Sequence, residues 1–337
     1  MSPRLPAVWC LLATCLALTA AEPSDRQRNP ARGVAPFPDD IDKRAVTIWS
    51  DGTRMAGDLY RPRHRSSGEK LPAIVLCAGT GGTKGGTQAR VAAIFAHHGY
   101  VVLAFDYRGW GESESQLMSV GHQPKPGPDN RMTVMVRALR WQMNYADQTE
   151  DIRAAISFLA GEPGVDPGRI GLWGSSYGGG LVTWVAGNDP RVRCVAAQVP
   201  GGFSPPTPAR EIQSRELATR QARGETEPVP LETGRLGGKM AAYENMRVNP
   251  AKNIGYGVLE AAAKIGCPVL FVVAENEELS SNAGVEQAHR SLLGRGVPSR
   301  YHVLRGISHY GVYREGFEEA TRVEVKWFNA HLGKPAR

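Results

Sequence analysis

Short apolar runs alternate with amphipathic stretches along most of this chain. Nearly continuous apolar runs are typical of strands that are buried on both faces of a parallel sheet. Stretches with apolar residues every three or four positions predict helices. The predicted strands are 71–77, 100–105, 169–173, 192–199, 268–274 and 300–304, and the predicted helices are 88–98, 149–159, 177–186, 282–293 and 315–332. This alternation predicts an α/β fold, with a mostly parallel, twisted sheet and helices on both faces.

Two β-rich runs precede the first of these strands. Residues 45–50 and 55–60 flank Asp51-Gly52, a dipeptide that favours a tight hairpin turn. We therefore expect an antiparallel hairpin at one edge of the sheet.

Residues 203–264 interrupt the alternation. They are rich in Arg, Glu, Pro and Gly, have weak helical patterns at 211–220 and 239–246, and show no strand pattern. Because they lie between two predicted strands of the sheet, we expect them to protrude as an insert. The remaining residues, 41–202 and 265–337, have a size that is normal for one α/β domain.

The first 21 residues have a different character. Arg4 precedes an apolar run from Ala7 to Leu18, and small residues follow up to Ala21. This is the order of a secretory signal sequence, and the run is shorter than the roughly 20 residues that span a bilayer. We expect cleavage after Ala21 and a secreted or periplasmic protein without a membrane span, in which Pro-rich residues 22–40 form an arm or linker.

The composition excludes several classes of protein. Of the 337 residues, 42% are hydrophobic and 22% are charged, which is ordinary for a globular protein. The net charge of +7 is mild and comes without basic runs, so we expect no nucleic-acid partner. After residue 21 only Cys77, Cys194 and Cys267 remain, and their spacing does not match metal ligands. We expect them to be buried apolar side chains, and we expect no cofactor or metal.

The strongest chemical signal is the segment Gly174-Ser175-Ser176-Tyr177-Gly178. It matches G-x-S-x-G, follows a predicted strand and opens a predicted helix, which is the setting of a nucleophile elbow. The two glycines permit a sharp turn, and the helix start favours the anion that forms during acyl transfer. Ser176 is therefore the predicted nucleophile.

A serine nucleophile needs a base, and the base needs an acid to orient it. His309 follows the last predicted strand and reaches the same sheet edge as Ser176, so it is the predicted base. The acid should follow strand 268–274, where Glu275, Glu277 and Glu278 are candidates. The length of the turn favours Glu277, and the other two remain alternatives.

Two backbone amides must stabilise the oxyanion. One belongs to the residue after the nucleophile, Tyr177, and the other to the Gly-rich turn after strand 71–77. In that turn we expect Thr80 to be the donor, with Gly81 as the alternative. The turn does not have the spacing of a phosphate-binding loop.

With these motifs the chain resembles the α/β-hydrolase superfamily, and within it the serine esterases similar to dienelactone hydrolases and X-Pro peptidases. Four segments carry the resemblance: DGTRMAGDLYRP, FDYRGWGES, RIGLWGSSYGGG and GISHYGVY. The resemblance implies that Asp106, Arg108 and Gly109 shape the wall beside the site, and that residues 203–264 form a lid. The chain departs from the pattern in two ways. Dienelactone hydrolase uses cysteine where Ser176 stands, and the family acid is commonly aspartate.

Together these features predict an exported serine hydrolase that cleaves small-molecule carboxylic esters. The acyl-enzyme would form on Ser176, with His309 and Glu277 completing the triad. One alternative is a serine peptidase or amidase of the prolyl-oligopeptidase kind. Another is a non-catalytic binding protein with the same fold.

Overall fold

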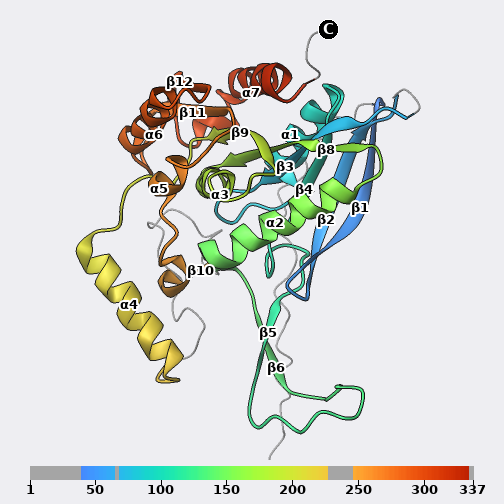
Figure 1. The fold of residues 1–337 in the computed structure, drawn as a ribbon, viewed down its shortest axis with the longest axis vertical. Coiled ribbons are helices and arrows are strands. Elements are labelled where there is room, and N and C mark those ends of the chain that lie inside the picture. Colours follow the sequence, from blue (N-terminus) through green and yellow to red (C-terminus); the bar gives the residue numbers. More distant parts are fainter. Residues whose placement is uncertain (1–38, 65–67, 227–245, 334–337) are drawn as a thin grey trace, which may run out of the picture. The chain divides into compact units, whose positions relative to one another are not determined.

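The computed structural model describes residues 39–64, 68–226 and 246–333 (Figure 1). Within them, an eight-stranded sheet has the order β1-β2-β4-β3-β8-β9-β11-β12. Its strands are β1 Ile41–Ser50, β2 Thr53–Pro62, β3 Leu71–Cys77, β4 Val101–Phe105, β8 Val165–Ser175, β9 Val192–Gln198, β11 Val269–Asn276 and β12 Ser299–Ser308. Strand β2 pairs antiparallel with both neighbours, and the other pairs are parallel. The predicted mostly parallel sheet is confirmed.

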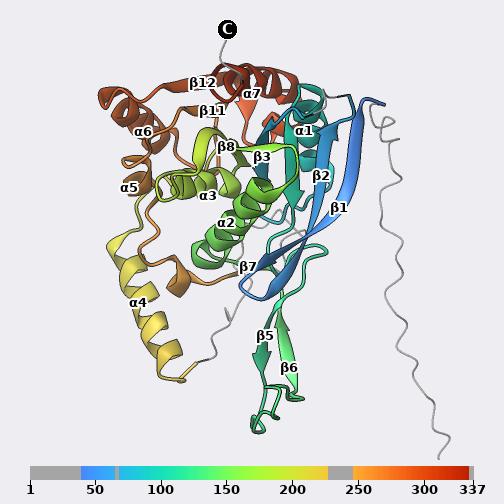
Figure 2. The same cartoon turned by 45° about the vertical axis from the view of Figure 1, so that its right-hand side comes forward.

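Helices cover both faces of this sheet (Figures 1 and 2). On one face pack α1 Gly86–His97 and α7 Phe317–His331. On the other face pack α2 Tyr145–Gly161, α3 Tyr177–Ala186, α5 Val258–Ala262 and α6 Asn282–Gly294. Side chains of β3 alternate between the two cores, since Ala73, Val75 and Cys77 join one and Ile74 and Leu76 the other. Burial on both faces explains the continuous apolar runs.

The hairpin of β1 and β2 turns at Asp51-Gly52. Both residues have positive φ, 45° and 73°. Two left-handed residues in succession match the twist of the flanking strands, and Asp and Gly tolerate this conformation well. The predicted hairpin is confirmed, and it begins four residues earlier than the sequence pattern indicates.

Between β9 and β11 the chain leaves the sheet. Helix α4, Pro208–Ala222, has no buried residue, whereas α5 buries Val258, Ala261 and Ala262 and packs on α3. Between them lie β10 Arg247–Val248 and a short 3-10 turn, Pro250–Asn253. The expectation of no strand in this stretch is wrong, because β10 pairs in parallel with β7 Gln142–Met143, outside the main sheet. The helix predicted at 239–246 falls almost wholly outside the described residues, as do the predicted signal sequence and nearly all of 22–40.

A second excursion follows β4. Strands β5 Gln116–Ser119 and β6 Val136–Leu139 form a two-stranded ribbon that projects from the body of the molecule (Figure 2). We call residues 116–139 the ribbon arm. Its exposed hydrophobic side chains are Leu117, Val120, Met132, Met135 and Val136. The sequence patterns did not predict this arm, because a ribbon without a buried face needs no alternation of apolar and polar residues.

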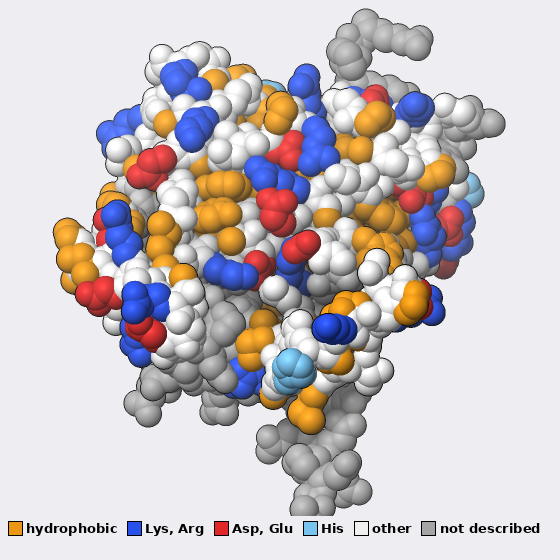
Figure 3. Space-filling view, turned by 60° about the horizontal axis from the view of Figure 1, so that its bottom comes forward, with side chains coloured by type: hydrophobic (Ala, Val, Ile, Leu, Met, Phe, Trp, Pro, Cys, Tyr) orange, Lys and Arg blue, Asp and Glu red, His pale blue; other side chains and the backbone are white. Residues whose placement is uncertain are grey.

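Charged side chains are mixed over the surface. On the face shown in Figure 3, basic and acidic groups are interspersed, without a continuous basic surface among the described residues. No helix in the described part of the chain combines the length and the apolar character needed to cross a bilayer.

Candidate active site

The turn from β8 into α3 has the geometry of a strained elbow. Ser176 has φ 55° and ψ −120°, a combination that L-residues rarely adopt and that the surrounding structure must enforce. A Cβ at Gly174 would lie 2.3 Å from the carbonyl oxygen of Gly178, and one at Gly178 would lie 2.2 Å from that of Cys77. Both glycines of the motif are therefore required by close backbone contacts, and Ser176 stands at the end of the strand.

The structure brings Ser176, His309 and Glu277 together. His309 follows β12 and is 2% exposed. Its Nε2 lies 3.0 Å from Ser176 Oγ, and its Nδ1 lies 2.9 Å from each carboxylate oxygen of Glu277. One imidazole thus bridges a hydroxyl and a carboxylate, which is the arrangement that lets a base take a serine proton.

Each of the three candidate glutamates has a different partner. Glu277 contacts the imidazole, whereas Glu278 accepts the backbone N–H of His309 at 2.8 Å. Glu275 accepts hydrogen bonds from Arg305 at 2.6 Å and from the backbone N–H of Gly306 at 2.7 Å. Only Glu277 of the three is placed to orient the ring of His309, while the other two hold the backbone around it.

The Glu277 carboxylate is stabilised in its charged form. Burial acts to raise its pKa, but the hydrogen bond with His309 opposes this. The backbone N–H groups of Leu279 and Ser280, at 2.9 and 3.0 Å, add to the effect. The net result is a pKa below the ordinary glutamate value, so Glu277 can accept the Nδ1–H of His309 at neutral pH.

The two residues predicted to donate to the oxyanion, Thr80 and Tyr177, belong to segments next to Ser176. A Cβ at Gly79 would lie 3.1 Å from Ser176 Cβ, so the turn that carries Thr80 passes next to the nucleophile. Tyr177 is the first residue of α3, where backbone N–H groups have no acceptor within the helix. The Gly-rich turn and the start of α3 therefore both lie next to the predicted nucleophile, and the assignment of Thr80 and Tyr177 as donors stays a prediction.

The side chains of Thr80 and Tyr177 contact residues that the motifs did not reveal. Thr80 Oγ1 lies 3.7 Å from Met143 Sδ, and the Tyr177 hydroxyl donates to Gln148 Oε1 at 2.6 Å. The Tyr177 ring packs edge-on against Tyr145, with 5.4 Å between the ring centroids. Met143 and Gln148 lie in a segment without a recognisable motif, so the sequence offered no signal for them.

Asp106 and Arg108 have different surroundings. The Asp106 carboxylate accepts the backbone N–H groups of Lys84, at 2.6 Å, and Glu112, at 2.9 Å, and so connects the Gly-rich turn to the loop after β4. Arg108 instead forms a buried ion pair with Asp151, with Nε 2.7 Å from Oδ1. Of these two residues, Asp106 contacts the turn that carries Thr80, whereas Arg108 is paired with a residue of α2.

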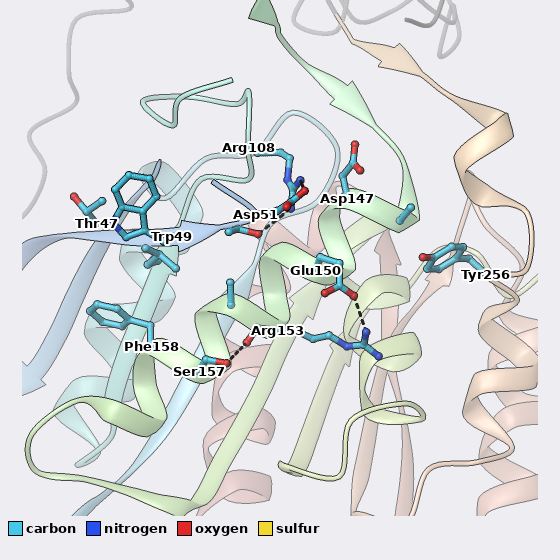
Figure 4. Close-up of a pocket in the computed structure, with 14 residues that line it drawn as sticks. Thr47, Trp49, Asp51, Arg108, Asp147, Glu150, Arg153, Ser157, Phe158 and Tyr256 are labelled. Atoms are coloured by element: carbon cyan, nitrogen blue, oxygen red, sulfur yellow. Dashed lines mark hydrogen bonds and ion pairs between the residues drawn. The ribbon is translucent and has the colours of Figure 1, made fainter. Parts of the chain in front are cut away.

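A groove of about 850 Å³ lies between β1 and α2 (Figure 4). Trp49 and Phe158 line one part of it, and Glu150, Arg153 and Tyr256 line another. None of its lining residues belongs to the Ser176, His309 and Glu277 group, so the groove is a feature separate from the candidate active site.

The three cysteines within the described residues are free. Cys77 and Cys194 are buried, as expected, while Cys267 is only half-buried. Burial holds the pKa of the Cys194 thiol well above its ordinary value, which keeps it protonated. Among the described residues, no group of three or more His, Cys, Asp or Glu side chains could hold a metal ion.

Two protein-family models match this chain. The model of the X-Pro dipeptidyl-peptidase (S15) family matches residues 51–204, and that of the prolyl oligopeptidase family matches residues 137–335. An uncharacterised 31.7 kDa protein from the traX-finO intergenic region of Escherichia coli is 26% identical, over 78% of this chain and 92% of its own. Thiohydrolase apmlB of Arthrinium phaeospermum is 33% identical, over 52% of this chain and 50% of its own.

Among solved structures, the α/β hydrolase GrgF from Penicillium sp. sh18 is similar, with a TM-score of 0.64 and 18% identity. The alignment covers 87% of this chain and 99% of that one. This likeness shows the fold. The prolyl oligopeptidase model spans more than half of the chain, including both Ser176 and His309. The chain therefore belongs to the prolyl oligopeptidase family, within the α/β-hydrolase superfamily of serine hydrolases.

Proposed function

We propose that this protein is an exported serine hydrolase that cleaves carboxylic esters through an acyl-enzyme on Ser176. The observation that carries the proposal is the position of His309, with Nε2 3.0 Å from Ser176 Oγ and Nδ1 2.9 Å from Glu277. Export is inferred from residues 1–21 of the sequence.

In the first half of the reaction, Ser176 Oγ attacks the ester carbonyl carbon and its proton moves to His309 Nε2. Glu277 holds the imidazole in the tautomer that accepts this proton and stabilises the imidazolium that forms. The backbone N–H groups of Thr80 and Tyr177 stabilise the oxyanion. When the tetrahedral intermediate collapses, the bond to the alcohol oxygen breaks and His309 returns the proton to that oxygen.

In the second half, a water molecule attacks the acyl carbon while His309 takes one of its protons. Collapse of this intermediate breaks the bond to Ser176 Oγ, which recovers its proton from His309. The products are a carboxylic acid and the free enzyme. No cofactor or metal enters either half.

A serine peptidase or amidase is the second candidate, because both matching family models describe peptidase families. We favour an ester because one relative, 33% identical over about half of each chain, is named a thiohydrolase and not a peptidase. Short p-nitrophenyl esters and Pro-containing p-nitroanilides separate the two candidates. Faster turnover of the anilides would reverse the preference.

A fluorophosphonate probe tests the proposed nucleophile. We expect the wild-type protein and the control Ser157→Ala, which alters an exposed serine of α2, to be labelled equally. Ser176→Ala should not be labelled. Labelling of Ser176→Ala at the wild-type rate would remove the basis of both hydrolase candidates.

Mass spectrometry of the protein recovered outside the producing cell tests export. A mature N-terminus at Glu22 is expected. Recovery only inside the cell, with the first 21 residues still attached, would contradict the proposal.

A further inference from the structure

We infer that Ser175, the residue before the nucleophile, is a positioning residue that couples the elbow to the turn after His309 through Tyr313. This inference rests on the proposed function of Ser176. Ser175 is 3% exposed, and its hydroxyl contacts Tyr313, which packs against the core on the face of the sheet that α1 and α7 cover. It therefore cannot touch a substrate, and any effect it has on catalysis must act through neighbouring residues.

The hydroxyl of Ser175 lies between two buried or half-buried polar groups. Gln198 Nε2 donates to Ser175 Oγ at 2.9 Å, and Ser175 Oγ forms a second hydrogen bond with the Tyr313 hydroxyl at 2.8 Å. The backbone carbonyl of Gln198 also accepts the N–H of Ser176 at 2.8 Å. Gln198 thus holds both serines, one through its side chain and one through its backbone.

Tyr313 belongs to the segment that carries the base. It ends the 3-10 turn Gly311–Tyr313, four residues after His309. The contacts of His309 with Glu277 and Glu278 fix it to the end of β11, whereas Ser176 is fixed to the ends of β8 and β9. The bond between Ser175 and Tyr313 joins these two groups of segments directly.

The strained backbone of Ser176 makes this bond significant. A residue at φ 55° and ψ −120° stays there only because surrounding contacts hold it. If the bond is lost, the elbow and the His309 turn can shift relative to one another. Misplacement of reacting groups by about 1 Å can reduce the rate by about 10²-fold, so a smaller shift is sufficient for a measurable loss.

The test compares Tyr313→Phe, which removes only a hydroxyl, with the control Tyr301→Phe, which removes a hydroxyl from a half-buried tyrosine on β12. For Tyr313→Phe we expect kcat on a short p-nitrophenyl ester to fall by about tenfold while KM changes by less than about twofold. The rate of fluorophosphonate labelling should fall in parallel. Tyr301→Phe should match the wild type.

Two further measurements separate positioning from a structural role. Active-site titration should find the same fraction of reactive protein in Tyr313→Phe and in the wild type, because the rate per site is what changes. Partial unfolding would instead lower the fraction and leave the rate per site intact. The double variant Ser175→Ala/Tyr313→Phe should lose no more than Ser175→Ala alone, because Ser175→Ala already removes the bond to Tyr313 together with the bond to Gln198.

The inference is overturned if Tyr313→Phe keeps kcat within about twofold of the wild type, or if the losses of the two single variants multiply. Fluorophosphonate labelling of Ser176→Ala distinguishes a failure of this inference from a failure of the proposed function. If Ser176→Ala is unlabelled while Tyr313→Phe behaves as wild type, only the role of Ser175 and Tyr313 is wrong. If Ser176→Ala is labelled normally, the proposed function fails first.

Discussion

Glu324 is a carboxylic acid enclosed in the core between α7 and the sheet, with 0% exposure. Burial raises its pKa to about 8, from 4.5 in the unfolded chain, and the nearby indole of Trp173 offsets only part of this rise. At neutral pH the folded protein therefore keeps Glu324 protonated while the unfolded chain ionises it. Because the folded state binds the extra proton, stability falls as the pH rises between these two values.

The size of the effect follows from this difference. The gap from 4.5 to about 8 is about 3.5 pH units, and each unit corresponds to about 1.4 kcal/mol. Glu324 thus lowers the free energy of unfolding by about 3 kcal/mol at pH 7, and by about 5 kcal/mol above pH 8, relative to acidic solution. Glu324→Gln keeps the shape and cannot ionise, so it should remove this loss.

Urea titration of the wild type and of Glu324→Gln at about pH 5 and about pH 9 measures the effect. From about pH 5 to about pH 9, the free energy of unfolding of Glu324→Gln should rise by several kcal/mol relative to that of the wild type. Glu318→Gln, on the exposed side of the first turn of α7, is the matched control and should show no such gain. A difference between Glu324→Gln and the wild type that is equal at both pH values would refute the reasoning.

Three other substitutions test the elbow, the triad acid and the core. Glu277→Gln should lower kcat by about 10²- to 10⁴-fold, because the ring of His309 loses its anionic partner, whereas Glu275→Gln should stay within about threefold, as measured by ester hydrolysis. Gly178→Ala should abolish fluorophosphonate labelling, since its Cβ would lie 2.2 Å from a backbone oxygen. Arg108→Ala should lower the free energy of unfolding by about 3–5 kcal/mol in urea titration, because it leaves the buried Asp151 without its cation.

The predictions for Gly178→Ala and Arg108→Ala each have a matched control. Gly161→Ala, at the end of α2, meets nothing within 4 Å and should be labelled like the wild type. Arg153→Ala breaks a partly exposed pair with Glu150 and should change the free energy of unfolding by less than about 1 kcal/mol. If Gly161→Ala lost labelling as Gly178→Ala does, close backbone contact would not be the cause. If Arg153→Ala lowered the free energy of unfolding as much as Arg108→Ala, burial of the ion pair would not be the cause.

The sequence predicted the parts of the molecule whose cause is local or periodic. Strand β3 and helix α3 have the predicted bounds, because continuous burial and the strand–Ser176–helix pattern are written in consecutive residues. The choice among three glutamates needed coordinates. They lie within four residues, and only the way the chain turns after β11 shows which carboxylate reaches the imidazole.

Other features left no pattern in the sequence. The ribbon arm buries no face, so its apolar residues show neither the two-residue period of a half-buried strand nor the 3.6-residue period of a helix. Arg108 lies in a segment that resembles an active-site wall, yet its partner Asp151 is 43 residues away on α2. The contact of Ser175 with Tyr313 spans 138 residues, a distance at which no spacing rule applies.

The separation of Ser176 from His309 also bears on when activity can arise. The two residues are 133 positions apart, and β11 and β12 must join the sheet before they meet. While the chain is being synthesised, the elbow can form long before His309 has left the ribosome. An exported chain that crosses the membrane before β12 pairs would therefore travel as an inert precursor. Under the proposed export, the producing cell would then not be exposed to the activity of the folded protein.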